Sequence, residues 1–324
     1  MLDRRSGQVN PGPASGSSGP SKSAAISADL MTIWNKYIQA SSISHALQAL
    51  ATAEGPARVI AGGTDILLDL QQGRSPEVDT LVDVTSIQEM KIIEIRQGRL
   101  YIGAAVPLSQ VVTHALVQAH APALVEAGSL IGGPQVRNSA TLGGNVAHAL
   151  PAADGSIALL AQGAQAEIAS LEGPRIVPLS MVYAGPGKTA LREKHDLLTG
   201  FFLPLRGAGE GAAFRRVMRP QGVALPVLNL AAWLKREAGT IIDARIAVGP
   251  AGPVPFRAVK TEALLRGQAY TEVLLQQAVE CLAGEARFRT SPHRATQEYR
   301  RHLSGVLLSE VLSTAWERAV EGAL

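Results

Sequence analysis

Two glycine-rich segments hold most of the ligand-binding residue types in this chain. Ala61-Gly-Gly-Thr-Asp65 follows the apolar pair Val59-Ile60, and a longer segment runs from Ile131 to Asp154. The longer segment contains two Gly-Gly pairs, an Arg-Asn pair and an aspartate, with few long apolar side chains. Because glycine weakens helices and strands alike, we expect no ordinary core element there. Glycine does let an anion approach backbone N–H groups closely, so two such segments predict a ligand with a pyrophosphate, such as a dinucleotide.

The elements around the first segment indicate how it is positioned. Residues 58–60 read as a short buried strand and residues 66–71 as a helix. Gly62 and Gly63 then precede a helix N-terminus, where free N–H groups and the helix dipole favour phosphate. A helix over 44–53, with Ser42 or Ser44 as N-cap, comes before this unit, and a strand over 80–84 follows it.

The remaining pattern predicts an α+β chain. Residues 91–95 and 100–103 form a hairpin, residues 108–115 and 121–129 form helices, and residues 156–162 form a short helix. Strands follow over 166–170, 175–178 and 196–204, and 207–211 is a glycine-rich linker. Strands over 212–217, 224–235 and 240–248 then precede helices over 271–283 and 297–320. Strands followed by helices indicate an α+β domain.

Composition excludes several classes of protein. The chain has 324 residues, a formal net charge of +3 and dispersed basic residues, so we expect no nucleic-acid partner. It has no run of about 18 apolar residues, so we expect no membrane span. The single cysteine, Cys281, excludes an internal disulfide and an iron–sulfur cluster held by this chain alone, and it suits a reducing, cytoplasmic compartment. Residues 1–25 are rich in Ser, Gly and Pro and are expected to form a disordered tail.

Both glycine-rich segments resemble one family of proteins. The resemblance lies in Ala61 to Asp65, in the run from Gln135 to Asn145, and in Pro151-Ala-Ala-Asp154. These residues are similar to the FAD-binding (medium) subunit of molybdenum hydroxylases, the family of xanthine dehydrogenase and carbon monoxide dehydrogenase, with the vanillyl-alcohol-oxidase-type (PCMH) FAD fold. Weaker similarity at 187–191, 245–249 and 291–302 extends the resemblance from about Met31 to the end.

The resemblance implies a domain organisation. A two-part PCMH-type FAD-binding domain is expected over 26–206, with subdomains of about 26–85 and 90–206. A C-terminal α+β domain of the molybdenum hydroxylase flavoprotein type, with an antiparallel sheet and helices, is expected over 212–324.

The resemblance also implies a set of FAD contacts. The pyrophosphate would lie on the N–H groups of residues 62–65 and 143–145, and Asp154 would accept hydrogen bonds from the ribityl hydroxyls. Ile131 and one of Leu197 and Leu198 would pack on opposite faces of the isoalloxazine, and Arg215 would lie near the flavin edge. The first segment has no His or Cys for a covalent link, so FAD is expected to be non-covalent. The cofactor-binding residues are therefore expected to be Ala61, Gly62, Gly63, Thr64, Asp65, Ile131, Arg137, Asn138, Thr141, Gly143, Gly144, Asn145, Asp154, Leu197, Leu198 and Arg215.

Structural roles are open for several of these residues. Either Gly-Gly pair alone is compatible with a tight turn. Arg137 can fix its own loop by binding a neighbouring carbonyl, and Asp154 can cap a helix from Ser156. His148 is compatible with acid–base chemistry, but the sequence shows no carboxylate partner for it. The charged run Arg192 to Asp196 leaves the assignment of Leu197 and Leu198 open.

The function implied is electron transfer. A small partner with [2Fe–2S] clusters would pass electrons to FAD in this chain and then to an acceptor, NAD above all. A large partner would hold the molybdopterin cofactor and carry out hydroxylation, in a dimer of heterotrimers. This reading requires no catalytic residue of this chain. Two alternatives are a self-sufficient flavin oxidoreductase and a redox-inactive scaffold subunit.

Overall fold

The structure is a computed structural model that describes residues 33–219, 225–292 and 294–321. The tail expected over 1–25 lies outside the described residues. Residues 33–321 fall within one compact unit, which contains both glycine-rich segments.

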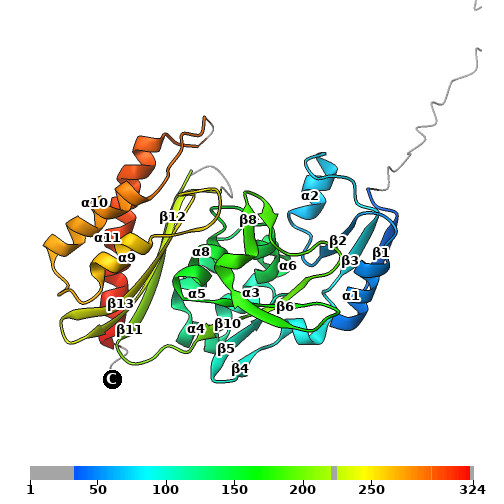
Figure 1. Cartoon of the computed structure of the whole chain (residues 1–324), viewed down its shortest axis with the longest axis horizontal. Helices are drawn as coiled ribbons and strands as arrows, with labels where there is room; N and C mark the ends of the chain where they lie inside the picture. Colours follow the sequence, from blue (N-terminus) through cyan, green and yellow to red (C-terminus); the bar gives the residue numbers. More distant parts are fainter. Residues whose placement is uncertain (1–32, 220–224, 293, 322–324) are drawn as a thin grey trace, which may run out of the picture. The chain divides into compact units, whose positions relative to one another are not determined.

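The first subdomain is a small parallel sheet with two helices (Figure 1). Its strands β1 (Lys36–Gln39), β2 (Ala57–Ile60) and β3 (Thr80–Asp83) lie in the order β1-β3-β2. Helix α1 (Ile43–Thr52) begins after Ser42, whose side chain accepts a hydrogen bond from the His45 N–H, as a preferred N-cap residue does. Helix α2 (Ile66–Gln71) follows β2 and the first glycine-rich segment, as the sequence predicts.

The second subdomain is a five-stranded antiparallel sheet with helices. The sheet has the order β4-β5-β10-β6-β7. Its strands are β4 (Ile93–Arg96), β5 (Arg99–Gly103), β6 (Gln165–Ala169), β7 (Arg175–Pro178) and β10 (Leu197–Pro204). Both residues of the β4–β5 turn, Gln97 and Gly98, have positive φ, which tight hairpin turns require. The minor strands β8 (Tyr183–Gly185) and β9 (Lys188–Thr189) pair with each other, and 3₁₀ turns occupy Gln88–Lys91 and Leu179–Val182.

Six helices accompany this sheet in the described chain. They are α3 (Leu108–Thr113), α4 (Ala115–His120), α5 (Pro122–Ser129), α6 (Pro134–Ser139), α7 (Leu142–Ala147) and α8 (Asp154–Ala161). Helices α6 and α7 lie inside the long glycine-rich segment, so the expectation of no regular core element there is wrong. Helix α7 contains Gly143 and Gly144, but Thr141 caps it and Leu142 and Val146 are buried. Capping and burial outweigh the low helix propensity of glycine at these positions.

The C-terminal domain packs helices on an antiparallel sheet. Strands β11 (Glu210–Met218), β12 (Pro226–Glu237), β13 (Thr240–Gly249) and β14 (Phe256–Arg257) pair in sequence order. The long helix α11 (Gln297–Glu321) packs against β11 and β12, alongside α10 (Glu272–Glu285). The α+β class and the order of the three long strands and two long helices are confirmed, while α9 (Val259–Leu265) was not expected from the sequence.

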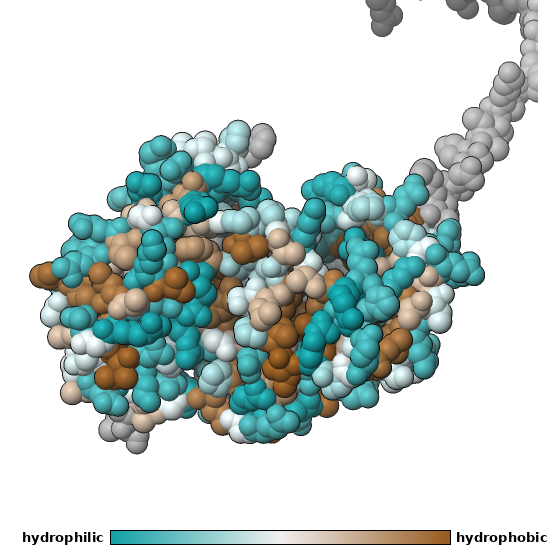
Figure 2. All heavy atoms as spheres, viewed as in Figure 1, coloured by the Kyte–Doolittle hydropathy of each residue, from teal (hydrophilic) through white to brown (hydrophobic). Residues whose placement is uncertain are grey.

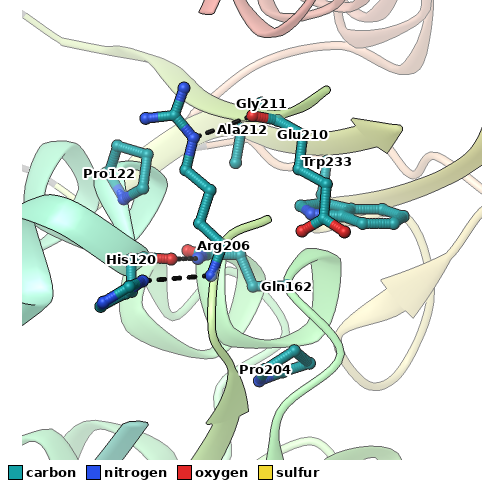
Figure 3. A pocket seen from close by; sticks show the side chains of 9 residues that line it. All are labelled: His120, Pro122, Gln162, Pro204, Arg206, Glu210, Gly211, Ala212 and Trp233. Carbon is teal, nitrogen blue, oxygen red and sulfur yellow. Dashed lines mark hydrogen bonds between the residues drawn. The ribbon is translucent and has the colours of Figure 1, made fainter. Parts of the chain in front are cut away.

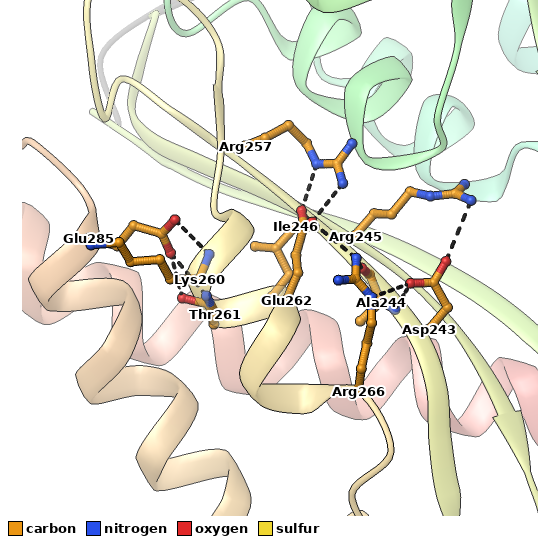
Figure 4. A network of polar contacts seen from close by, with 10 residues as sticks. All are labelled: Asp243, Ala244, Arg245, Ile246, Arg257, Lys260, Thr261, Glu262, Arg266 and Glu285. Carbon is orange, nitrogen blue, oxygen red and sulfur yellow. Dashed lines mark hydrogen bonds and ion pairs between the residues drawn. The ribbon is translucent and has the colours of Figure 1, made fainter.

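A polar network fixes α9 to the sheet (Figure 4). Glu262 accepts hydrogen bonds from the Ile246 N–H of β13 at 2.9 Å and from Arg257 at 2.6 and 2.7 Å. Glu285 of α10 accepts from the N–H groups of Lys260 and Thr261 at the start of α9. Because the Glu262 side chain is almost wholly buried, these bonds offset the cost of removing its charge from water.

Hydrophilic side chains cover most of the face drawn in Figure 2, with apolar side chains in patches between them. The exposed apolar residues include Val259 of α9 and Val273 of α10. Among the described residues, no helix is both long enough and apolar enough to cross a membrane.

Candidate cofactor site

The two glycine-rich segments meet backbone to backbone. A Cβ atom added at Gly62 would lie 1.9 Å from the Ser139 carbonyl oxygen and 2.9 Å from the Ala140 Cα atom. No side chain fits in that space, so Gly62 is required for the contact between the first segment and the end of α6. The tertiary structure thus brings together the two segments that the sequence predicted to share a ligand.

The first segment offers free N–H groups. In the part of the chain that the structure describes, the N–H groups of Gly62, Gly63, Thr64 and Asp65 donate to no residue. Gly63 has a φ of 70°, and the segment leads directly into α2. Unpaired N–H groups beside a helix N-terminus form a suitable site for an anion.

The second segment differs from the prediction. The N–H of Gly143 donates to the Ala104 carbonyl at 2.9 Å, that of Gly144 to Thr141 Oγ1 at 3.0 Å, and that of Asn145 to the Thr141 carbonyl at 3.0 Å. These bonds build and cap α7, so the expected free N–H groups occur in the first segment and not in the second. A Cβ atom at Gly143 would lie 2.6 Å from the Ala104 carbonyl oxygen, so this glycine lets α7 pack on the chain after β5.

His148 connects the two segments. At the C-terminus of α7, its Nδ1 lies 3.4 Å from Asp65 Oδ1 and its Nε2 lies 3.6 Å from Asp69 Oδ2. The hydrogen bond with Asp65 raises the pKa of His148 above its usual value, and the same bond lowers the pKa of Asp65. The sequence analysis found no carboxylate partner for His148, and this expectation is wrong. His148 has two carboxylate partners, Asp65 and Asp69, which are one helical turn apart.

Asp154 links the glycine-rich segment to the C-terminal domain. Its Oδ2 accepts from Arg216 Nη1 at 2.5 Å and its Oδ1 from Asn229 Nδ2 at 2.6 Å. Burial raises the pKa of the Asp154 carboxyl, and Arg216 and Asn229 act in the opposite direction. Helix α8 begins at Asp154 itself and its side chain makes no capping bond, so the N-cap alternative is wrong.

Several buried polar atoms near Asp154 lack hydrogen-bond partners. They are Asn145 Oδ1, Arg216 Nε and Asn229 Oδ1. A Cβ atom on Gly155 would lie 2.7 Å from Asn145 Oδ1, which places that amide over the start of α8. Unsatisfied buried polar groups cost stability, and they are typical of a site that a polar ligand completes.

Other predicted site residues have structural partners. Arg137 donates to the Ile131 and Gly132 carbonyls at 3.1 and 2.7 Å, so its loop-fixing role is observed. Ile131 is half-buried and Asn138 is exposed. Arg215 donates to Glu126 Oε1 of α5 at 3.1 Å and to the Phe214 carbonyl.

Leu197 and Leu198 lie in β10 and are 2% and 6% exposed, within the hydrophobic core that includes the five-stranded sheet. The charged residues before them form a structural anchor, because Asp196 accepts bonds from both Arg175 and Arg192. Both leucines therefore lie inside the core, and their side chains form no exposed surface beside the glycine-rich segments.

Two cavities of the described chain lie away from the glycine-rich segments. The first, with a volume of about 10 Å³, is lined by His120, Arg206 and Trp233 among others at the junction of the two domains (Figure 3). That space suits one water molecule. The second is an open groove between α10 and α11. The candidate site is therefore defined by the backbone of the glycine-rich segments and by Asp154 with its partners Arg216 and Asn229.

Sequence reasoning missed Arg216 and Asn229 as parts of this region, and it found no carboxylate partner for His148. Asp65 and Asp69 are four residues apart around a predicted helix, a spacing that places two carboxylates together and favours a cation between them. No local pattern distinguished Arg216 from Arg215 in their strand, because their neighbours belong to another domain.

The comparisons with known proteins agree with this architecture. Residues 31–206 match the model of the FAD binding domain in molybdopterin dehydrogenase, and residues 212–315 match the CO dehydrogenase flavoprotein C-terminal domain. The chain is 31% identical over 281 residues to the xanthine dehydrogenase FAD-binding subunit of Escherichia coli O157:H7, covering 86% of this chain and 95% of that one. It is 27% identical to the carbon monoxide dehydrogenase medium chain of Hydrogenophaga pseudoflava, with 87% and 97% covered.

Solved structures show the same relationship. A chain of carbon monoxide dehydrogenase from Hydrogenophaga pseudoflava superposes with a TM-score of 0.83 and 27% identity, over 88% of this chain and 98% of that one. A chain of quinoline 2-oxidoreductase from Pseudomonas putida 86 gives a TM-score of 0.81 at 26% identity, with the same coverage. The fold, the paired glycine-rich segments and these matches show that the chain belongs to the family of FAD-binding medium subunits of molybdenum hydroxylases, which are oxidoreductases.

Proposed function

We propose that this chain binds FAD non-covalently and relays electrons from partner [2Fe–2S] clusters, through FAD, to an acceptor such as NAD. The observation that carries the proposal is the backbone contact of Gly62 with Ser139, which joins both glycine-rich segments beside unpaired N–H groups. FAD supplies the redox chemistry, because a flavin accepts electrons singly and releases them as a pair.

The residues present fit such a cofactor. The N–H groups of Gly62, Gly63, Thr64 and Asp65 are placed to hold phosphate oxygens without help from lysine. The orphaned Oδ1 atoms of Asn145 and Asn229 are placed to accept hydrogen bonds from ligand hydroxyl or N–H groups. We assign the half-buried Ile131 to one face of the isoalloxazine ring. Packing of Leu197 or Leu198 on the other face stays a prediction, because both side chains are buried in the core.

The other predicted residues differ in role: some hold the second segment in shape, and others contact the ligand. Arg137 and Thr141 hold the second segment in shape, and Gly143 and Gly144 allow the close packing that brings Asn145 and Asp154 to the ligand. Asp154 binds the ribityl chain only through lone pairs that Arg216 and Asn229 leave free. Ala61 and Asn138 belong to the two segments, whereas Arg215, which is bound to Glu126, stays a prediction from the family resemblance.

The names of family members support a proposal for the partner subunits of this chain. Its named members include medium chains of multi-subunit dehydrogenases. We propose that a large molybdopterin subunit carries out hydroxylation and that a small [2Fe–2S] subunit delivers electrons, in a dimer of heterotrimers in the cytoplasm. The single cysteine of this chain supports cluster binding by another chain.

A visible absorption spectrum of the purified full chain tests cofactor binding. We expect the two-banded spectrum of an oxidised flavin, and free FAD in the supernatant after the protein is precipitated. Flavin that stays with the precipitate would contradict the non-covalent assignment. A colourless protein that takes up no added FAD would contradict FAD binding and favour the scaffold alternative.

A second experiment tests the acceptor. The flavin of the purified chain is reduced chemically without oxygen, and its reoxidation is followed after NAD, a quinone or oxygen is added. Fast reoxidation with formation of NADH supports the NAD assignment. Reduction of the flavin by a small organic substrate, in the absence of any partner, would instead favour a self-sufficient flavin oxidoreductase.

A further inference from the structure

Asp65 places a negative charge in a segment that otherwise suits an anion. Its N–H is one of those in the first glycine-rich segment that donate to no described residue, and its side chain is 57% exposed. The carboxylate belongs to the same residue as this N–H group, so it lies close to any phosphate bound there. Like charges at such a distance repel each other, and the segment therefore binds phosphate best when the charge of Asp65 is offset.

Asp65 and Asp69 have different cationic partners. Arg74 Nη2 lies 3.0 Å from Asp69 Oδ1. His148 Nδ1 lies 3.4 Å from Asp65 Oδ1, and among the described residues it is the only cationic group at ion-pair distance from Asp65. The charge of Asp65 is thus offset at close range by a group that is cationic only when it is protonated.

The second glycine-rich segment holds His148 in this position. His148 follows directly on α7, and its N–H donates to the Gly144 carbonyl at 3.0 Å. Its side chain is only 29% exposed. The backbone contact of Gly62 with Ser139 also joins the two segments. The imidazole is therefore fixed beside the first segment by the packing of the second.

The charged groups that face His148 favour its protonated form. The hydrogen bond with Asp65 raises the pKa of His148, and the nearby charges of Asp65 and Asp69 act in the same direction. Burial and the charge of Arg74 act against them, but the pKa stays above its usual value. His148 is consequently protonated over a wider pH range than an isolated histidine.

We propose that His148 is a positioning residue for FAD binding, whose imidazolium offsets the Asp65 carboxylate and so favours a phosphate group on the N–H groups of residues 62–65. This inference rests on the FAD-binding function proposed above. When His148 loses its proton, the same N–H groups lie beside an uncompensated carboxylate, so FAD binds more weakly. The expected rise in the dissociation constant is about two- to fivefold, the range typical of partly exposed charges.

FAD titrations of the full chain at a series of pH values test this inference. Bound FAD is removed, and its dissociation constant is measured by flavin fluorescence at constant ionic strength, from a pH of about 6.5 upward. We expect the dissociation constant to rise as pH passes through the raised pKa of His148. A chain that binds no FAD at any pH contradicts the proposed function and, with it, this inference. FAD binding with a dissociation constant that does not change with pH overturns the role of His148 alone.

Two variants separate an electrostatic role from a merely structural one. His148→Asn is expected to bind FAD at every pH as weakly as the unaltered chain does when His148 is neutral. Asp65→Asn is expected to act in the opposite direction and to bind FAD more tightly than the unaltered chain at high pH, because the repelling charge is gone. If His148 only joined the segments, both variants would bind FAD more weakly, and that result overturns the proposal.

His195→Asn is the matched control, because His195 is an exposed histidine of the same FAD-binding domain. Its pH profile is expected to match that of the unaltered chain. If His195→Asn removes the pH dependence as fully as His148→Asn does, the proposal is overturned. Because the side chain of Asp65 is more than half exposed, Asp65→Asn keeps the test informative if His148→Asn fails to fold.

Discussion

Arg216 of β11 and Asp154 of α8 form an ion pair of 2.5 Å in which both side chains are only 5% exposed. The pair joins the C-terminal sheet to the end of the second glycine-rich segment, and Asn229 of β12 completes it by donating to Asp154 and to the Ala152 carbonyl. The C-terminal domain is thus part of the structure that positions the second glycine-rich segment, and not a separate appendage.

Replacing one member of this pair is expected to be costly. Asp154→Ala leaves Arg216 buried without its counter-charge, so we expect the free energy of unfolding to fall by about 3–5 kcal/mol. Chemical denaturation of the full chain measures this loss. The double variant Asp154→Ala with Arg216→Met is expected to lose less than the sum of the two single variants, since it removes both charges. Additive losses would show that the two side chains do not act as a pair.

Gly62 is expected to tolerate no side chain. Gly62→Ala places a Cβ atom 1.9 Å from a backbone oxygen that cannot move independently, so the two segments must separate. We expect loss of FAD binding together with a destabilisation of about 1–3 kcal/mol. Flavin content after gel filtration and the unfolding midpoint are the two measurements.

Gly185→Ala is the matched control for this change. Gly185 lies in the same domain, and its added Cβ would meet nothing within 4 Å. FAD binding is expected to be unchanged in this variant. If Gly62→Ala binds FAD as well as Gly185→Ala does, the contact between the segments is not needed for the cofactor.

The contacts of His148 predict a pH dependence. A His pKa raised in the folded state contributes stability below its unfolded value of about 6.5, and this contribution is lost as pH rises through the higher folded value. Because the pKa of Asp65 is lowered in the folded state, Asp65 contributes stability above its unfolded value of 3.8. This contribution is lost as pH falls through the lower folded value. The pair is therefore strongest between these limits.

His148→Asn is expected to remove this dependence. Because Asp65 is more than half exposed, we expect the pair to contribute about 1 kcal/mol or less. As pH rises above about 6.5 and through the raised pKa of His148, the unfolding free energy of the unaltered chain should fall relative to that of the variant. FAD retention is measured over the same range. Parallel pH curves for the two proteins would exclude a role for His148 in joining the segments.

Glu126 forms a second connection between the domains. It accepts bonds from the Phe214 N–H at 2.7 Å, from Arg215 at 3.1 Å and from Arg318 at 2.6 Å. Burial acts to raise the pKa of Glu126, but Arg318, the Phe214 N–H and Arg215 outweigh it and the pKa is lowered. Its contribution to stability is therefore present above its usual pKa and is lost on acidification.

Glu126→Gln is expected to lower the free energy of unfolding by about 1–3 kcal/mol at neutral pH, and to make the protein less sensitive to acid. Urea unfolding at neutral and acidic pH measures both effects. Glu94→Gln serves as control, because Glu94 pairs with Arg96 on an exposed hairpin. Equal losses in both variants would contradict a special role for the connection through Glu126.

Local sequence determined much of the fold. The helix over Ile66–Gln71, the N-cap at Ser42 and the hairpin around Gln97 and Gly98 depend on propensities and turn residues within a few positions, and the structure contains them as expected. The glycine-rich motifs also sufficed to identify the family, because their spacing is specific to it. These features can be predicted from a sequence because each depends on residues that are close together in the chain.

Only the tertiary structure decided which polar groups are free. The N–H groups of Gly143, Gly144 and Asn145 are used within α7, whereas those of Gly62 to Asp65 are not, although both stretches look alike as sequence. Arg216 pairs with Asp154 across 62 positions of the chain, and His148 lies between Asp65 and Asp69. Such pairings depend on how the faces of separate domains pack, which no local periodicity encodes, so they appear only when the chain is folded.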